Sequence, residues 1–107
     1  MRLTQIRDFV AVVDAGSISA AARLLNVSQP GLTKSIGNLE AELAVSLLQR
    51  TPRGVSLTRY GRAFYARARA AHSELDKAQQ ELAQLAGGHT GKVAIGFGPL
   101  AAALVLP

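Results

Sequence analysis

The chain has 107 residues, no cysteine and a net charge of +5, from 12 Lys and Arg against 7 Asp and Glu. This length allows one small domain with an appendage, and the absence of cysteine excludes disulfides and thiolate metal sites. The positive charge favours a polyanionic partner, either a nucleic acid or a membrane surface, or it is simply solvated.

Neither end of the sequence resembles a targeting or membrane segment. The first residues lack the apolar core of a signal peptide, and the longest wholly apolar run, residues 100–106, is far too short to cross a bilayer. We therefore expect a cytoplasmic protein with no membrane partner.

The first predicted helix runs from about Leu3 to Ala15. Its apolar residues recur at helical spacing and mark one buried stripe, formed by Ile6, Phe9, Val10 and Val13. Gly16 follows at the position where a helix commonly ends in the left-handed conformation.

A short second helix is predicted over residues 20–25. Ser19 is expected to cap its start, and Asn26 can take the left-handed conformation that ends it. Three consecutive alanines at the start of this helix allow another backbone to approach closely. Val27 is expected to fill the core beneath the turn.

Ser28 is the predicted cap of a third helix, with Pro30 in its first turn, where an N–H has no helical partner in any case. Apolar residues repeat at spacings of four, three and four, which predicts a buried face of Leu32, Ile36, Leu39 and Leu43. The opposite face is polar and carries Gln29, Thr33, Lys34 and Asn38.

After the third helix the period changes, and residues 48–50 and 55–57 are predicted as two short strands. The segment Thr51-Pro52-Arg53-Gly54 suits a tight turn between them, since proline fits its second position and Gly54 can adopt a positive φ. The sequence therefore predicts a small hairpin with Arg53 at its tip.

Thr58 is predicted to cap a long helix over residues 59–86. Its apolar residues repeat every four and three residues for three heptads, at Phe64, Ala68, Ala71, Leu75, Ala78, Leu82 and Leu85. A stripe this narrow on a helix this long is typical of a dimerisation helix. The alternative is an amphipathic helix that folds back on its own domain.

The segment after this helix is expected to begin another domain. Gly87-Gly88 is predicted to be a hinge, and residues 92–97 alternate like a strand for which the chain supplies no partner. The predicted division is a winged helix-turn-helix over residues 1–58, a linker helix over 59–86, and a hinge with the truncated start of a second domain over 87–107.

Two helices joined by a tight turn and followed by a hairpin favour DNA as the partner, because the major groove admits one helix. Gln29, Thr33 and Lys34 are placed to meet base edges, and the hairpin is placed to insert Arg53 into the minor groove. The expected contacts also include Ser17, Ser19, Ser28, Asn38 and Arg50. A helical module that binds a partner protein is the alternative, but such a module has no use for an arginine-tipped hairpin.

The run from Ala21 to Pro30 resembles the first half of the signature of the LysR family of bacterial transcription regulators. The resemblance continues at Leu32, Ile36, Leu39-Glu40, Leu43, Leu47-Leu48, Arg50-Thr51, Arg53-Gly54 and Leu57-Thr58. It covers essentially the whole chain, with departures such as Ala44, which stands where the family usually has glycine.

This resemblance implies a mainly α fold, in which a winged helix-turn-helix precedes a long dimerisation helix. It implies a sequence-specific transcription regulator that binds an inverted-repeat operator as a homodimer or tetramer, with a further domain that senses a small-molecule effector. The family's DNA contacts fall here on Gln29, Pro30, Gly31, Thr33, Lys34 and Arg53.

Signals for other chemistry are weak. Residues 96–101 fit a loose glycine pattern for dinucleotides but lack the rest of that site. His72 and His89 are interpreted as isolated, without a carboxylate or second histidine at ligand spacing, so no metal site is expected. The serines lack a base and an orienting carboxylate, and Glu40 is expected to be a structural partner for an arginine. We therefore expect neither an enzyme nor a resident cofactor in these residues.

Overall fold

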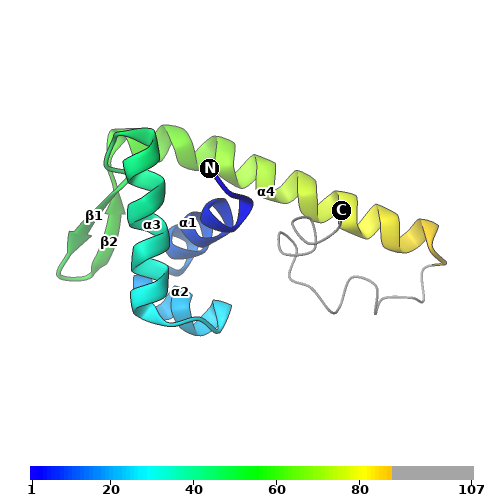
Figure 1. The fold of residues 1–107 in the computed structure, drawn as a ribbon, viewed down its shortest axis with the longest axis horizontal. Coiled ribbons are helices and arrows are strands. Elements are labelled where there is room, and N and C mark those ends of the chain that lie inside the picture. The colour runs from blue at the N-terminus through cyan, green and yellow to red at the C-terminus, as the bar shows by residue number, and fades with distance from the viewer. Residues whose placement is uncertain (88–107) are drawn as a thin grey trace.

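The computed structural model describes residues 1–87, which form four helices and one two-stranded antiparallel sheet (Figure 1). In chain order the elements are α1 (Leu3–Ala15), α2 (Ile18–Leu25), α3 (Gln29–Leu43), β1 (Leu48–Thr51), β2 (Gly54–Leu57) and α4 (Arg59–Leu85). The predicted fold class, a mainly α winged helix-turn-helix with a long final helix, is confirmed. The strand expected at residues 92–97 lies outside the described residues.

The core lies where α1 packs against α2, α3 and the start of α4. Its fully buried large side chains are Phe9, Val12, Leu32, Leu39 and Leu47. The spacing of apolar residues predicted three buried residues in each of α1 and α3 correctly, but Val13 and Leu43 are only half-buried. Val12, which lies beside the predicted stripe of α1, is fully buried instead. These faces orient the two helices because removing each large apolar side chain from water is worth roughly 1.5–3 kcal/mol.

The turn between α2 and α3 differs from the prediction at one residue. Asn26 adopts the left-handed conformation as predicted, with φ 58 and ψ 46. The N–H of Val27 then donates to the carbonyl of Ala22 at 3.0 Å, which closes the end of α2. The side chain of Val27 is 40% exposed, so the prediction that it fills the core is wrong. Asn26 turns the chain so that the backbone of Val27, and not its side chain, faces the helix end.

Two of the three predicted helix caps are confirmed and one is wrong. Ser28 Oγ accepts the N–H of Gly31 at 3.1 Å, and Thr58 Oγ1 accepts the N–H of Gly61 at 3.0 Å. The cap of α2 is Ser17, whose Oγ accepts the N–H of Ala20 at 3.1 Å. Ser19 lies inside the first turn, because the backbone is already helical from Ile18 onward.

The hairpin of β1 and β2, which we call the wing, is held against the turn between α1 and α2. Thr51 pairs with Gly54, so the turn is Pro52 and Arg53. The N–H of Val55 donates to the carbonyl of Gly16 at 3.2 Å. Gly54 has φ 138, and a β-carbon there would overlap the same Gly16 carbonyl. Glycine is therefore required for the wing to lie this close to α1.

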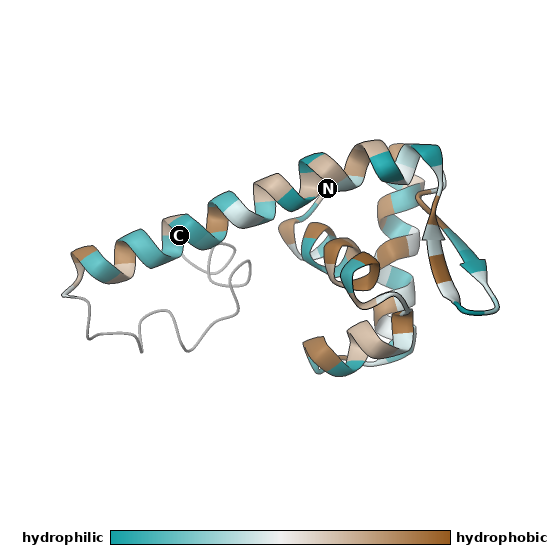
Figure 2. Cartoon of the chain, turned by 180° about the vertical axis from the view of Figure 1, so that it is seen from behind, coloured by the Kyte–Doolittle hydropathy of each residue, from teal (hydrophilic) through white to brown (hydrophobic). Residues whose placement is uncertain are grey.

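The first turns of α4 belong to the core of the domain. Phe64 packs on Phe9 with ring centroids 5.4 Å apart, and Ala68 is only 3% exposed. The prediction that the whole stripe from Phe64 to Leu85 faces a partner is therefore corrected at its first two positions, which the domain's own α1 covers. The 27 residues of α4 extend roughly 40 Å. The second half of the helix leaves the domain (Figure 1), and Figure 2 shows hydrophobic bands along it.

A polar cluster fixes the direction in which α4 leaves the domain. The Tyr65 hydroxyl donates to Asp14 on α1, and Arg69 Nη1 donates to the Tyr65 hydroxyl at 3.0 Å. Hydrogen bonding to Tyr65 and the nearby charge of Asp14 raise the pKa of Arg69. Residues one turn apart on α4 are thus both tied to the end of α1.

No helix within residues 1–87 is both long and apolar enough to cross a membrane.

Ala44 ends α3 in a conformation that alanine rarely adopts, with φ 61 and ψ 27. A left-handed conformation costs an L-residue roughly 1–2 kcal/mol, whereas glycine adopts it freely but gains unfolded-state entropy. We expect Ala44→Gly to raise the free energy of unfolding by about 0.5–1 kcal/mol and the melting temperature by roughly 2–8 °C. Urea and thermal unfolding measure this.

The matched control is Ala41→Gly, three residues earlier in α3 at an exposed position of regular helical conformation. It should lower the free energy of unfolding by about 1 kcal/mol. If Ala44→Gly destabilises the chain as much as Ala41→Gly does, the left-handed end of α3 carries no strain.

Candidate nucleic-acid interface

One face of α3 is free of contacts with the rest of the domain. Leu32, Ile36 and Leu39 hold the helix against the core, which leaves the opposite face in solvent. The exposed residues of that face are Gln29, Pro30, Gly31, Thr33, Lys34 and Asn38. The structure thus places all six α3 residues that the sequence predicted as contacts on one accessible surface.

A groove runs along one flank of this face, between α3, the start of α2 and the wing. We call it the wing-side groove, and its volume is about 280 Å³. It is lined by Ser17, Ile18, Ser19, Gln29, Thr33, Arg50, Thr51, Pro52, Gly54 and Val55. No acidic side chain lines it, so its charge comes from Arg50. Five predicted contact residues from three elements therefore meet in one groove.

Arg53 and Ser28 lie outside this groove but on its borders. Arg53 is exposed at the tip of the wing, next to Pro52. Ser28 is exposed at the start of α3. Within residues 1–87, neither Arg50 nor Arg53 forms a salt bridge, so both guanidinium groups are available to an anionic partner.

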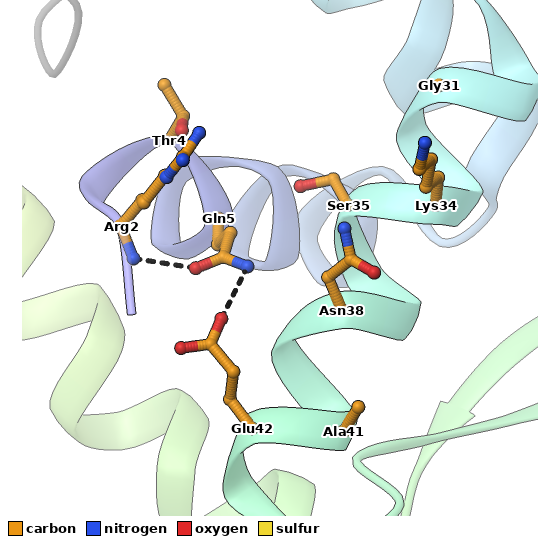
Figure 3. A pocket seen from close by; sticks show the side chains of 9 residues that line it. All are labelled: Arg2, Thr4, Gln5, Gly31, Lys34, Ser35, Asn38, Ala41 and Glu42. Carbon is orange, nitrogen blue, oxygen red and sulfur yellow. Dashed lines mark hydrogen bonds between the residues drawn. The ribbon is translucent and has the colours of Figure 1, made fainter.

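A second groove, of about 560 Å³, runs along the other flank of α3, and we call it the α1-side groove (Figure 3). It is lined by Arg2, Thr4, Gln5, Gly31, Lys34, Ser35, Asn38, Ala41 and Glu42. Lys34 and Asn38 thus face this side and not the wing. Arg2 and Thr4 were not among the predicted contacts, because nothing in their local pattern shows that the start of α1 lies beside α3.

One end of the α1-side groove is negatively charged and fully hydrogen-bonded. Gln5 Nε2 donates to Glu42 Oε1 at 3.0 Å, and the amino terminus of Met1 lies 2.8 Å from Glu42 Oε2. The interaction with the amino terminus and the hydrogen bond from Gln5 lower the pKa of Glu42. Gln5 Oε1 also accepts the N–H of Arg2 at 2.6 Å, which ties the start of α1 to this network.

Glu40 connects α3, whose exposed face we call the recognition face, to the wing. Its Oε2 accepts the N–H of Leu47 at 2.7 Å and the N–H of Leu48 at 3.1 Å, where the chain enters β1. The prediction that Glu40 pairs with an arginine is therefore wrong, although its structural role is correct. A carboxylate satisfies two adjacent backbone amides here because the chain turns back beside α3.

The interpretation of His72 as isolated is also wrong. His72 Nδ1 lies 3.5 Å from Asp76 Oδ2, one helical turn along α4. Within residues 1–87 there is no group of three or more His, Cys, Asp or Glu side chains that could hold a metal ion. His89 lies outside the described residues.

An exposed recognition helix, a helix start beside it and an arginine-tipped wing define a winged helix-turn-helix protein. The family to which this winged helix-turn-helix belongs can also be identified. The bacterial regulatory helix-turn-helix proteins of the lysR family match residues 3–62, more than half of the chain, and the chain belongs to this family.

The relatives are transcription regulators that extend well beyond this chain. The nitrogen assimilation regulatory protein nac of Escherichia coli (strain K12) is 39% identical over 103 residues, covering 96% of this chain and 34% of that protein. The regulator TcbR of Pseudomonas sp. (strain P51) is 37% identical over 97 residues, covering 91% and 33%. The chain thus spans about a third of the length of these relatives.

Solved structures of similar fold include complexes with DNA. The BenM DBD with catB site 1 DNA aligns with a TM-score of 0.76 and 40% identity, covering 83% of this chain and all of that one. The CbnR DBD with DNA aligns with a TM-score of 0.69 and 42% identity, covering 80% of this chain and 98% of that one.

The hydrogen bonds of Glu40 generate a stability prediction. Hydrogen bonds to a charged group contribute about 1.5–3 kcal/mol and neutral ones about 0.5–1.5 kcal/mol. Glu40→Gln should therefore lower the free energy of unfolding by about 1–2 kcal/mol. The control is Glu42→Gln, two residues along the same helix on an exposed carboxylate, which should change it by less than half as much. Equal losses in urea unfolding would show that Glu40 does not anchor β1.

Proposed function

We propose that the chain is the DNA-binding part of a LysR-type transcription regulator. The observation that carries this proposal is the exposed polar face of α3, with the wing-side groove and the unpaired Arg50 and Arg53 beside it. The solved DNA complexes of similar chains support it. A module that binds only a partner protein would not need a positively charged wing next to a polar helix face.

The chemistry of the α3 face suits base recognition in the major groove. The amide of Gln29 can pair with adenine N6 and N7, and Lys34 can donate to guanine O6 and N7. The methyl group of Thr33 can contact the thymine methyl. All three side chains are exposed and start from the first two turns of α3, which is the part of a recognition helix that enters the groove.

The serines at the helix starts suit the phosphate backbone. Ser17 Oγ and Ser28 Oγ each accept a backbone N–H as caps, which leaves each hydroxyl hydrogen free to donate to a phosphate oxygen. Ser19 lines the wing-side groove within the first turn of α2. The positive ends of α2 and α3 favour phosphate at the same places.

The wing suits the minor groove. Arg53 projects from a two-residue turn whose base is fixed on Gly16 by the Val55 hydrogen bond. Because the wing is anchored rigidly, less conformational entropy is lost when Arg53 enters the minor groove. A narrow minor groove also attracts arginine electrostatically. Arg50 lies further from the tip of the wing and can contact the DNA phosphate backbone beside the minor groove.

We infer that the second half of α4 forms the dimer contact. Its large apolar side chains are unusually exposed for a single chain, with Leu82 at 56% and Leu85 at 77%. The free stripe comprises the half-buried Leu75 and the exposed Ala71, Ala78, Leu82 and Leu85. A dimer, or a tetramer of the complete protein, would bind two half-sites of an inverted repeat.

The longer relatives support the remaining parts of the proposal. The domain is residues 1–58, the linker helix is 59–86, and 87–107 leads into a domain that senses a small-molecule effector. A protein that binds bacterial genomic DNA must be in the same compartment as that DNA, so we infer a cytoplasmic location. A regulator of this kind needs no catalytic residue, and we propose none.

Substitutions on α3 and on the wing should have different effects on DNA binding. Gln29→Ala and Thr33→Ala should relax base preference at particular positions, because a good base contact contributes about 1–3 kcal/mol of discrimination. Arg53→Ala should weaken selected and random duplexes more evenly, apart from any A-tract preference. Affinities for a panel of single-base variants at several salt concentrations measure both effects. If both α3 variants keep the wild-type preference, α3 does not recognise the bases.

Charge placed on the free stripe of α4 should separate the dimer. Leu82→Arg with Leu85→Arg should give a monomer by analytical ultracentrifugation, because a buried unpaired charge costs several kcal/mol. Both side chains are exposed in the single chain, so its fold should not change. Gln80→Arg with Gln84→Arg, on the opposite side of the same turns, is the control and should remain dimeric. A dimer of unchanged dissociation constant in the leucine variant would place the interface elsewhere.

A further inference from the structure

The α1-side groove has an unequal distribution of charge along its length. Arg2 and Lys34 are its positive side chains, and Glu42 is its negative one. In Figure 3 the charged ends of Arg2 and Lys34 lie on the same side of Gln5 and Asn38, away from the Glu42 carboxylate. The end with Arg2 and Lys34 therefore attracts an anion, whereas the carboxylate at the other end is paired with the amino terminus.

The negative end already has its partners, whereas the positive end does not. Glu42 accepts a hydrogen bond from Gln5 and pairs with the amino terminus. Within residues 1–87, neither Arg2 nor Lys34 forms a salt bridge. Thr4 adds a hydroxyl to the same wall of the groove. The open end thus combines an arginine, a lysine and a hydroxyl, and the charge of Arg2 acts on Glu42 only from beyond salt-bridge distance.

The position of this groove relative to α3 identifies the anion. A helix in the major groove has a phosphate backbone on each side, because the groove is only about 12 Å wide. The wing-side groove, with Ser17 and Arg50, faces one backbone. The α1-side groove lies on the other flank of α3, so it faces the second strand.

We propose that Arg2 and Thr4 form a phosphate site for the DNA strand opposite the one that the wing-side groove contacts. The guanidinium of Arg2 donates to the phosphate oxygens in a fork, and Thr4 donates through its hydroxyl. Lys34 extends from the same groove toward the bases. The recognition helix is thus held from both flanks, and α1 is part of the DNA interface. This inference rests on the proposed function.

Salt dependence of binding tests this site. The proteins are the 107-residue chain, Arg2→Ala, Arg2→Lys and the control Arg67→Ala, an exposed arginine of α4, each with its tag at the C-terminus. The duplexes are one selected by the wild-type chain from a random pool and one of random sequence. Arg2→Ala should lose about five- to tenfold in affinity for both, and the slope of log K against log salt should fall by about 0.9. Arg2→Lys should keep the slope, and Arg67→Ala should resemble the wild type.

Methylphosphonates, which replace a charged phosphate of the DNA with a neutral group, locate the phosphate that Arg2 contacts. Single methylphosphonates are placed in turn along both strands of the selected duplex. At one position the methylphosphonate should weaken binding of the wild type but not of Arg2→Ala. A second position, identified in the same way with Arg50→Ala, should lie on the opposite strand. An unchanged slope for Arg2→Ala, or a shared strand with Arg50, would overturn the inference while leaving the proposed function intact. A wild-type chain that fails to bind any duplex with salt dependence would overturn both.

Discussion

The carboxylate of Glu40 is the interaction on which the geometry of the interface depends. It lies on the recognition helix and accepts two backbone N–H groups from the start of β1, so it fixes the wing relative to α3. The same stretch fixes α4, because the carbonyl of Leu47 accepts the N–H of Thr58 at 3.0 Å. Apolar packing orients the helices against one another, and this charge-assisted pair of hydrogen bonds adds a defined geometry between α3 and the start of β1.

The first helix is the scaffold that the other elements share. Its middle supplies the core through Phe9, and its last residues contact both the wing and the linker helix, through Gly16 and Asp14. Its first residues form a wall of the α1-side groove. One rigid element therefore sets the positions of the wing, of α4 and of the second flank of α3.

The long helix has two functions that divide near its middle. Its first turns are covered by α1 and complete the domain, and the Tyr65 and Arg69 hydrogen bonds to Asp14 hold its direction. Its second half leaves large apolar side chains such as Leu82 in solvent. A single continuous helix with both properties transmits the orientation of the recognition face to the proposed dimer contact. The distance and angle between two such faces would then be set by the helix and not by a flexible linker.

Local sequence patterns were enough to predict the helices and strands, because the spacing of apolar residues and the capping and turn residues act over a few positions. The sequence could not decide which of two nearby serines caps α2. In the structure Ser17 is extended and the helix begins at Ile18, so Ser17 and not Ser19 is the cap. The sequence could not show that Glu40 would meet backbone amides, that Ala68 would be covered by its own domain, or that Arg2 would lie beside the recognition helix. Each of these depends on which distant segment covers a given face. Periodicity defines a buried face but not its partner, and only the packing of the helices in three dimensions supplies one.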